Sequence, residues 1–296
     1  MHRYLVDDIE KDEIQSGFLV TAGRKRIWNT ELEILAIFDE ICRRHDLRYY
    51  LDFGTLLGAV RHQGIIPWDD DIDVSMMRPD YERFKEIAAN ELHTPYFLQT
   101  AYTDNFTMAF AKIRDSRTSA VEFPYRQDMN QGIFIDIFPL DDARDGSERM
   151  EHILAMENEL WGAVVDPAVI EQALSNGRQM DVNPKVLKQI LAMPPMERMQ
   201  TFESFCMRHF GESETVNLIT SENLYHGANY RRDWYANVVR LPFEKLTLPA
   251  PAEYELRLRA QFGDYKQFIK GASCHGNIIF SADISYESYY GEGAQG

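Results

Sequence analysis

Residues 53–55 read Phe53-Gly54-Thr55, and residues 68–74 read Trp68-Asp69-Asp70-Asp71-Ile72-Asp73-Val74. Just upstream, residues 48–53 are rich in aromatic side chains, which is typical of a short strand, and the Gly-Thr pair interrupts it before an apolar helical stretch over 56–60. Residues 71–77 then alternate as a half-buried strand does. The order strand, glycine turn, helix, strand predicts a phosphate site at the start of the helix.

Asp71 and Asp73 are the central candidates for catalysis. Residues i and i+2 of a strand project from the same face, about 6.5–7 Å apart at Cα, so these carboxylates point the same way. Paired carboxylates hold hard cations such as Mg²⁺, and two ions about 3.5–4 Å apart can clamp the attacking and leaving oxygens of a phosphoryl transfer. An isolated acidic run is more often a solvated loop or a helix cap, so it is the surrounding strand and turn pattern that favours a metal site.

A third carboxylate and a phosphate-binding element complete the predicted site. Asp136 lies in the otherwise apolar run 133–138, where an aspartate is costly to bury unless it is paired or binds a metal. Gly54 and Thr55 offer backbone N–H groups and a hydroxyl at the positive end of a helix. We therefore predict two Mg²⁺ or Mn²⁺ ions, with Asp71, Asp73 and Asp136 as catalytic metal ligands and Gly54 and Thr55 as donor-phosphate ligands.

Five further residues have two open interpretations each. Asp69 would face the metal pair and orient its ligands if the strand extends backward, or it is a turn residue after Pro67-Trp68. Four basic residues either bind the donor phosphates or carry ordinary charge: Arg61, His62, Lys112 and Arg114.

The remaining sequence divides into core elements and an added helical part. Helices are expected over 30–45, capped by Asn29 or Thr30, from 78 onward and over 252–262, and strands over 96–102, 106–114, 132–139 and 243–248. Helical periodicity dominates 147–210, with breaks at Asp166-Pro167, Asn183-Pro184 and Pro194-Pro195. The tail 271–296 is expected to be loosely ordered. The predicted fold class is α+β (α/β), a mixed β-sheet flanked by helices, with a catalytic core over 1–143, a mainly helical subregion over 144–237 and a C-terminal part over 238–296.

Composition and charge narrow the partners and the compartment. The 296 residues are 45% hydrophobic and 26% charged, as in an ordinary folded protein, and the formal net charge of −16 disfavours a nucleic-acid partner. The widely spaced Cys42, Cys206 and Cys274 predict neither a disulfide framework nor a structural zinc site and favour the cytoplasm. An acidic N-terminus and the lack of an apolar run of about 20 residues predict neither a signal peptide nor a transmembrane segment. A membrane would therefore matter only as the location of a substrate, which the protein would reach at the inner face.

The run from Tyr50 to Val74, YLDFGTLLGAVRHQGIIPWDDDIDV, closely resembles the LicD family. The resemblance continues through 78–84 (RPDYERF), 112–115 (KIRD) and 132–141 (GIFIDIFPLD), and more weakly through 242–244 and 262–265. It leaves out the helical subregion and the last residues. The proline-containing continuation that usually follows Gly263-Asp264-Tyr265 is replaced here by residues 266–270.

This resemblance implies a nucleotidyltransferase-like fold and the transfer of a phospho-alcohol to a cell-surface glycan such as teichoic acid or lipopolysaccharide, or to its lipid-linked precursor. In the best-known members the group is phosphocholine from CDP-choline, and relatives include the fukutin-type ribitol-phosphate transferases. Gly54 and Thr55 match the family's phosphate-binding turn, and Asp71 and Asp73 match its metal-binding pair. Asp136 matches a position in a family motif, and its role as a metal ligand is inferred from the expected fold. The helical subregion is then expected on the acceptor side.

Three functions remain open at this point. The leading hypothesis is metal-dependent transfer of a phosphocholine-like group from a CDP-alcohol or related nucleotide donor to a glycan hydroxyl. A nucleotidyltransferase that uses an NTP donor and releases pyrophosphate would employ the same metal site. The third is a non-catalytic binding protein on the same fold, against which the intact Asp71, Asp73 and Asp136 argue.

Overall fold

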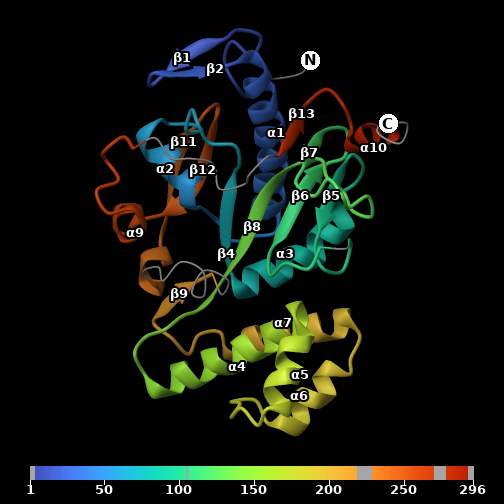
Figure 1. Cartoon of the computed structure of the whole chain (residues 1–296). Coiled ribbons are helices and arrows are strands. Elements are labelled where there is room, and N and C mark those ends of the chain that lie inside the picture. The colour runs from blue at the N-terminus through green and yellow to red at the C-terminus, as the bar shows by residue number, and fades with distance from the viewer. Residues whose placement is uncertain (1–3, 105, 219–228, 270–277, 293–296) are drawn as a thin grey trace.

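A computed structural model describes residues 4–104, 106–218, 229–269 and 278–292 of the protein. Its centre is a mixed sheet, which runs in the order β10-β9-β8-β4-β3, with β6 paired to β8 and β5 paired to β6 (Figure 1). Only the β4–β8 pair is parallel among the pairs of this sheet in the described ranges. The fold class predicted from the sequence is confirmed. The strands are β3 (Tyr50–Leu51), β4 (Asp73–Met77), β5 (Tyr96–Gln99), β6 (Ala111–Asp115), β8 (Ile133–Asp142), β9 (Thr215–Asn217) and β10 (Tyr230–Arg231).

Alternation along the strands separates a packed face of the sheet from a polar one. Ile72 and Val74 belong to the main hydrophobic core, together with side chains of α1 (Ala22–Arg44) and α3 (Arg78–Glu91). Asp73 and Asp136 occupy the alternating positions of β4 and β8 and so face the other side. The candidate site therefore lies on the face opposite this core.

The long helical segment has a hydrophobic cluster of its own. It comprises α4 (Glu148–Val165), α5 (Pro167–Ser175), α6 (Pro184–Leu191) and α7 (Pro195–His209), which form a layer below the sheet in Figure 1. Leu160, Leu187 and Phe202 are among the buried side chains that hold these helices together. Each helix break predicted at a proline is confirmed, because α5, α6 and α7 all have proline in the first turn. The division of the chain into three domains stays a prediction.

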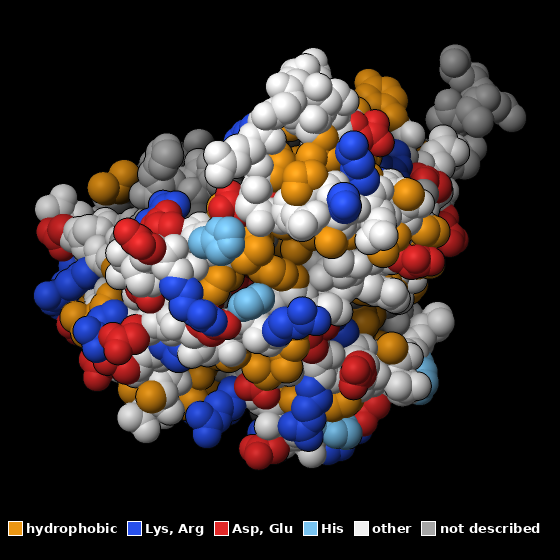
Figure 2. All heavy atoms as spheres, turned by 90° about the horizontal axis from the view of Figure 1, so that it is seen from below, with side chains coloured by type: hydrophobic (Ala, Val, Ile, Leu, Met, Phe, Trp, Pro, Cys, Tyr) orange, Lys and Arg blue, Asp and Glu red, His pale blue; other side chains and the backbone are white. Residues whose placement is uncertain are grey.

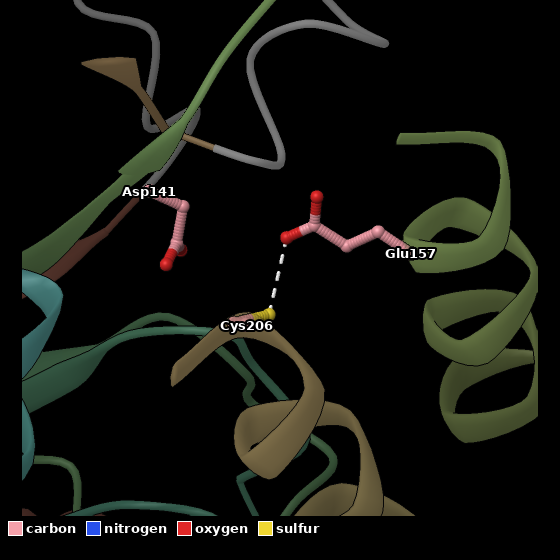
Figure 3. A group of neighbouring side chains, drawn as sticks. All are labelled: Asp141, Glu157 and Cys206. Atoms are coloured by element: carbon pink, nitrogen blue, oxygen red, sulfur yellow. Dashed lines mark hydrogen bonds between the residues drawn. The ribbon is translucent and has the colours of Figure 1, made fainter. Parts of the chain in front are cut away.

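A buried polar group joins the helical segment to the sheet (Figure 3). Cys206 of α7 donates a hydrogen bond to Glu157 Oε1 of α4 at 3.1 Å. Asp141 of β8 lies beside them, and one side-chain oxygen or sulfur atom from each of the three residues lies within 4.8 Å of the others. Asp141 accepts two hydrogen bonds from the Arg78 guanidinium, one of them from Nε at 2.7 Å, and Arg78 Nη1 donates to Glu82 at 2.9 Å. Arg78 thus supplies the charge that compensates the buried carboxylate.

The structure differs from the expectations drawn from the sequence in three places. Helix α1 begins at Ala22, where the Thr21 hydroxyl accepts from the Arg24 N–H at 3.2 Å, so the predicted cap at Asn29 or Thr30 is wrong. The expected strand over 243–248 is broken by a turn with φ of 51° at Glu244, which joins β11 (Val238–Phe243) to β12 (Leu246–Pro251). The expected loosely ordered tail is ordered over two elements, β13 (Ile279–Ser281) and α10 (Tyr286–Glu292), whereas 271–277 and 293–296 lie outside the described residues.

Packing explains the first and the third of these differences. The first turns of α1 carry Arg24, Lys25 and Arg26, and these basic residues mask the helical periodicity of apolar side chains in the sequence. In the structure, Lys25 is nevertheless fully buried. Strand β13 pairs with β7 (Ser119–Val121), a long-range contact that tail composition does not encode. The other elements are β1 (Glu13–Gln15), β2 (Phe18–Val20), α2 (Phe53–Arg61), η1 (Arg232–Tyr235) and α9 (Tyr254–Phe262).

The surface carries charges of both signs. Seen from below, Lys and Arg side chains are interspersed with Asp and Glu, and apolar side chains gather near the centre of the face (Figure 2). Among the described residues, none of the helices has both the length and the apolar character needed to cross a membrane.

Candidate active site

The strand register brings the three predicted metal ligands together. In the parallel β4–β8 pair, Asp73 stands directly opposite Asp136, and both project from the polar face. Asp71 precedes Asp73 by two residues. One carboxylate oxygen from each of the three lies within 4.8 Å of the others. The cluster therefore has the compactness that a shared cation requires, while the assignment of these residues as metal ligands stays a prediction.

Burial makes this cluster electrostatically costly. The exposed fraction is 9% for Asp73 and 3% for Asp136, and Asp71 is partly buried. Burial, followed by the charges of Asp71 and Asp136, raises the pKa of Asp73 well above its usual value. Ionised carboxylates kept this close repel one another unless a cation compensates them. Hard oxygen donors in a compact, shielded set fit Mg²⁺ or Mn²⁺.

Lys112 lies at the edge of the carboxylate cluster. On β6 it stands opposite Asp136, and its Nζ lies 3.0 Å from Asp136 Oδ1 and 3.0 Å from Glu122 Oε1. The ammonium also sits 3.4 Å from the centre of the Phe134 ring. The structure thus places Lys112 beside the metal candidates, as predicted, and its role toward donor phosphate stays a prediction.

Arg114 is more deeply engaged with the protein than Lys112. It is fully buried and donates from Nε to Gln99 Oε1 at 2.6 Å, from Nη1 to the Gly132 carbonyl at 2.8 Å and from Nη2 to Glu122. These contacts hold β6 and the segment before β8 together. Its predicted contact with phosphate is untested, and the bonds above would compete with it.

The Gly-Thr turn forms the start of α2, where the Asp52 side chain accepts from the Phe53 N–H at 2.9 Å. The Thr55 hydroxyl accepts from the Asp73 N–H at 2.8 Å and so ties the turn to β4. A Cβ at Gly54 would lie 2.4 Å from Asp69 Oδ2, so a larger residue at this position would displace the Asp69 carboxylate. The first turn of α2 and the acidic segment are therefore in direct contact.

Asp69 belongs to a second group of close carboxylates. One oxygen each from Asp69, Asp70 and Asp71 lie within 4.8 Å of one another, and the Arg24 side chain donates to the Asp69 carbonyl at 2.6 Å. The carboxylate of Asp69 approaches Gly54 and also raises the pKa of Asp73. Both interpretations of Asp69, a residue that orients the metal ligands and a turn residue, agree with this position.

Arg61 and His62 lie at the other end of α2. Arg61 Nη1 donates to the carbonyls of Tyr265 and Gln267, each at 3.1 Å, and its guanidinium stands over the Phe268 ring at 4.8 Å. Burial, together with the charge of Arg61, lowers the pKa of His62 to about 4, so the imidazole is neutral at physiological pH. The structure does not bring these residues into the carboxylate cluster through any contact in its described part, and their phosphate role stays a prediction.

Sequence reasoning missed Glu31. This residue of α1 is 1% exposed, and its Oε2 has no hydrogen-bond partner among the described residues. Burial and then the nearby Asp71 raise the pKa of its carboxyl well above the usual value. A signal was present, because Trp28, Leu35 and Glu31 share one helix face that is otherwise apolar. The same argument that selected Asp136 would have selected Glu31.

The Glu31→Gln variant is expected to have a higher free energy of unfolding than the wild type at neutral pH, without added metal. Because its pKa in the folded protein is raised above 4.5, the folded state binds more protons than the unfolded state above that pH, and stability falls as pH rises. Glutamine removes this fall. Denaturant titrations from about pH 5 to about pH 8 measure it, with Glu33→Gln on the same helix as the control. An equally steep decline in the Glu31 variant would contradict the prediction.

Asp52 and Arg257 form a further charged pair that the sequence did not reveal. Arg257 Nη2 of α9 lies 2.5 Å from Asp52 Oδ1, and both residues are at most 1% exposed. The Arg257 guanidinium also stands 3.5 Å from the centre of the Tyr230 ring. The pair fixes the residue that caps α2, and with it the orientation of the Gly-Thr turn.

Comparison with known proteins finds sequence matches for this chain. Residues 46–161 match the family described as the LicD/FKTN/FKRP nucleotidyltransferase domain. The chain is 43% identical over 112 residues to the lipopolysaccharide cholinephosphotransferase LicD of Haemophilus influenzae, which covers 37% of this chain and 41% of that protein. It is 42% identical over 45 residues to the human ribitol 5-phosphate transferase FKRP, 15% of this chain and 9% of that protein.

The matched part is the part that carries the site. An uncharacterized protein of Rickettsia prowazekii is 41% identical over 71 residues, 24% of each chain. The chain spans about two fifths of the length of the LicD relative. The matched residues 46–161 contain the Gly-Thr turn, the acidic segment, Lys112 and Asp136. The similarity to the LicD/FKTN/FKRP nucleotidyltransferase domain thus covers the residues of the candidate site.

Proposed function

We propose that the protein is a metal-dependent transferase that moves a phosphocholine-like group from a CDP-activated donor to a hydroxyl of a cell-surface glycan or of its lipid-linked precursor. The observation that carries the proposal is the compact set of three carboxylates formed by Asp73 on β4, Asp136 on β8 and Asp71, two residues before β4. The name of the Haemophilus influenzae relative, a lipopolysaccharide cholinephosphotransferase, supports the choice of group and acceptor.

The residues of the cluster would bind the donor through charge and position. Asp71, Asp73 and Asp136 would hold two Mg²⁺ or Mn²⁺ ions. When bound, these ions would neutralise the negative charge on the donor's phosphate oxygens. The Lys112 ammonium adds a positive charge beside Asp136. The N–H groups of Gly54 and Thr55 precede the first hydrogen bond of α2, from Leu56 to the Asp52 carbonyl at 2.9 Å, so they remain available to phosphate oxygens.

The reaction would be a single in-line displacement. The oxygen of the acceptor hydroxyl forms a bond to the phosphorus that carries the alcohol, and the bond from this phosphorus to the bridging oxygen of CMP breaks. CMP leaves with that electron pair, and the hydroxyl proton passes to solvent. The helices α4–α7 would shape the acceptor side, and the enzyme would work in the cytoplasm, at the inner face of the membrane when the acceptor is lipid-linked.

A screen of CDP-alcohols, with and without Mg²⁺, is the direct test. CMP release from CDP-choline or another CDP-alcohol that requires both the metal and a glycan acceptor is the expected result, because the three carboxylates act only through a bound cation. The assay is repeated with CTP and a small acceptor to test the nucleotidyltransferase alternative. Pyrophosphate release from CTP, without CMP release from any CDP-alcohol, would replace our proposal by that alternative. Absence of donor and metal binding in calorimetry would favour a non-catalytic protein.

A further inference from the structure

Arg257 of α9 is a fully buried arginine that reaches the first turn of α2. Its Nε donates to the Tyr235 hydroxyl at 3.0 Å, its Nη1 donates to Gln261 Oε1 at 2.7 Å, and its Nη2 lies 2.5 Å from Asp52 Oδ1. Each nitrogen of the planar guanidinium therefore faces a different group, and together these groups fix its orientation. Helix α9 lies outside residues 46–161, the part of the chain that matches the LicD/FKTN/FKRP nucleotidyltransferase domain.

Asp52 is shared between Arg257 and the start of α2. The oxygen that faces Arg257, Oδ1, also accepts from the Phe53 N–H at 2.9 Å. The backbone of Asp52 makes two further hydrogen bonds, because its N–H donates to the Asp73 carbonyl at 3.2 Å and its carbonyl accepts from the Leu56 N–H at 2.9 Å. One buried residue thus connects the guanidinium to strand β4 and to the first turn of the helix.

Phe53, the first residue of α2, has a backbone conformation that needs support. Its φ is 45°, a left-handed value that bulky residues rarely adopt, and such strain persists only where the surroundings hold it. The Arg257 guanidinium lies 5.3 Å from the centre of the Phe53 ring, and the Phe138 ring meets Phe53 edge to face with centres 5.6 Å apart. Gly54 and Thr55 follow directly, so the direction of their N–H groups depends on how Phe53 is held.

Two tyrosines hold Arg257 itself. The guanidinium stands 3.5 Å from the centre of the Tyr230 ring, and the Tyr235 hydroxyl accepts from its Nε. Both tyrosines are at most 4% exposed, and the Tyr235 carbonyl accepts from the Tyr50 hydroxyl at 2.7 Å. The guanidinium is thus fixed by groups other than Asp52 as well, and it presents a single geometry to that carboxylate.

The ion pair of Arg257 and Asp52 differs from that of Arg78 and Asp141 in what it is joined to. A buried ion pair is by itself weak evidence for a functional role, because apolar residues can replace such a pair without loss of stability. The pair of Arg78 and Asp141 joins the helical segment to the sheet. Asp52, in contrast, caps a helix whose first N–H groups have no partner within the helix. Its pair with Arg257 therefore acts on the turn that would meet phosphate.

We infer that Arg257 is a positioning residue for the donor phosphates, which it does not touch. Through Asp52 it keeps the N–H groups of Gly54 and Thr55 in the direction in which they bind phosphate oxygens. The inference rests on the proposed function, because it assumes that a phosphate-linked donor binds at this turn. It adds that the donor site is complete only with α9, although the matched domain ends at residue 161.

Binding of CDP tests the inference without any chemical step. Arg257→Met keeps much of the side-chain volume but removes the guanidinium. We expect its dissociation constant for CDP, measured by calorimetry at saturating Mg²⁺, to rise by about ten- to a hundredfold. Two control variants should bind CDP as the wild type does. Arg259→Met removes an exposed arginine of the same helix, and Arg78→Met disrupts the buried pair with Asp141.

A second substitution separates positioning from a general loss of structure. Asp52→Asn keeps an oxygen that can accept from the Phe53 N–H but removes the charge that Arg257 meets. Because it is nearly isosteric, it also gives the test if Arg257→Met folds poorly, and we expect it to weaken CDP binding by about tenfold. Since Arg257 acts through Asp52, the variant with both changes should bind CDP within about twofold of Arg257→Met alone.

Three outcomes would overturn the inference. They are wild-type CDP binding by Asp52→Asn or by a folded Arg257→Met, additive weakening in the variant with both changes, and equal weakening in Arg78→Met. Failure of the proposed function would instead appear in the wild type, as the absence of CMP release from every CDP-alcohol with metal and acceptor present.

Discussion

Asp73→Asn is expected to lower the rate of metal-dependent CMP release by about a thousandfold or more, with the fold intact. Asp73 stands opposite Asp136 at the centre of the carboxylate cluster, so its replacement leaves two of the three charges for the cation. Single-turnover kinetics at saturating CDP-alcohol measure the loss separately from donor binding. Asp283→Asn, at an exposed carboxylate that pairs with Arg26 of α1, is the control and should retain the wild-type rate.

The same variant has a second readout that does not depend on activity. Without metal, its melting temperature should equal or exceed that of the wild type, because neutralising Asp73 removes repulsion from Asp71 and Asp136. Mn²⁺ at a hundred times its dissociation constant should stabilise the wild type by about 2.7 kcal/mol and the variant much less. Near-normal transfer by Asp73→Asn, or an equal stabilisation of both proteins by Mn²⁺, would remove the metal assignment.

Arg78→Met is expected to destabilise the protein by about 3–5 kcal/mol, the largest stability effect that we predict. Arg78 is fully buried and compensates Asp141, which is 2% exposed and lies beside Glu157 and Cys206 where the helical segment meets the sheet (Figure 3). Methionine fills much of the volume but leaves the buried carboxylate without its partner. The free energy of unfolding from denaturant titration measures the effect.

Two further variants separate charge from packing at this position. Arg149→Met removes a guanidinium that is 74% exposed and paired with Glu212, so its effect should stay within about 0.5 kcal/mol. Arg78→Met combined with Asp141→Leu replaces the whole pair and should recover most of the lost stability, since the orphaned charge is gone. If Arg78→Met were as mild as Arg149→Met, the buried pair would not have the structural role that we assign to it.

The local pattern of the sequence predicted many of the elements and selected the central acids as candidates. Strand alternation separated Asp71 and Asp73 from their acidic neighbours, and an aspartate inside an apolar run identified Asp136. The three proline positions at which helices begin between 147 and 210 were equally readable. These features depend on residues a few positions apart, where backbone period and side-chain chemistry act directly.

Contacts between distant residues were not readable in the same way. The tie between β13 and β7, the turn at Glu244 and the use of Arg61 to hold residues 265–267 all join segments that are far apart in the chain or depend on a neighbour's packing. Local composition carries no record of such a partner. For this reason the tail was expected to be loosely ordered, although β13 and α10 are formed.

By itself, then, the sequence predicted which residues have the chemistry of a phosphate-transfer site and on which face of an element each of them would lie. Only the tertiary structure decided that Asp136 stands opposite Asp73 and that Glu31 lies buried near the same carboxylates. The physical reason is that a face is set by the local backbone period, whereas register and neighbourhood are set by the packing of the whole core.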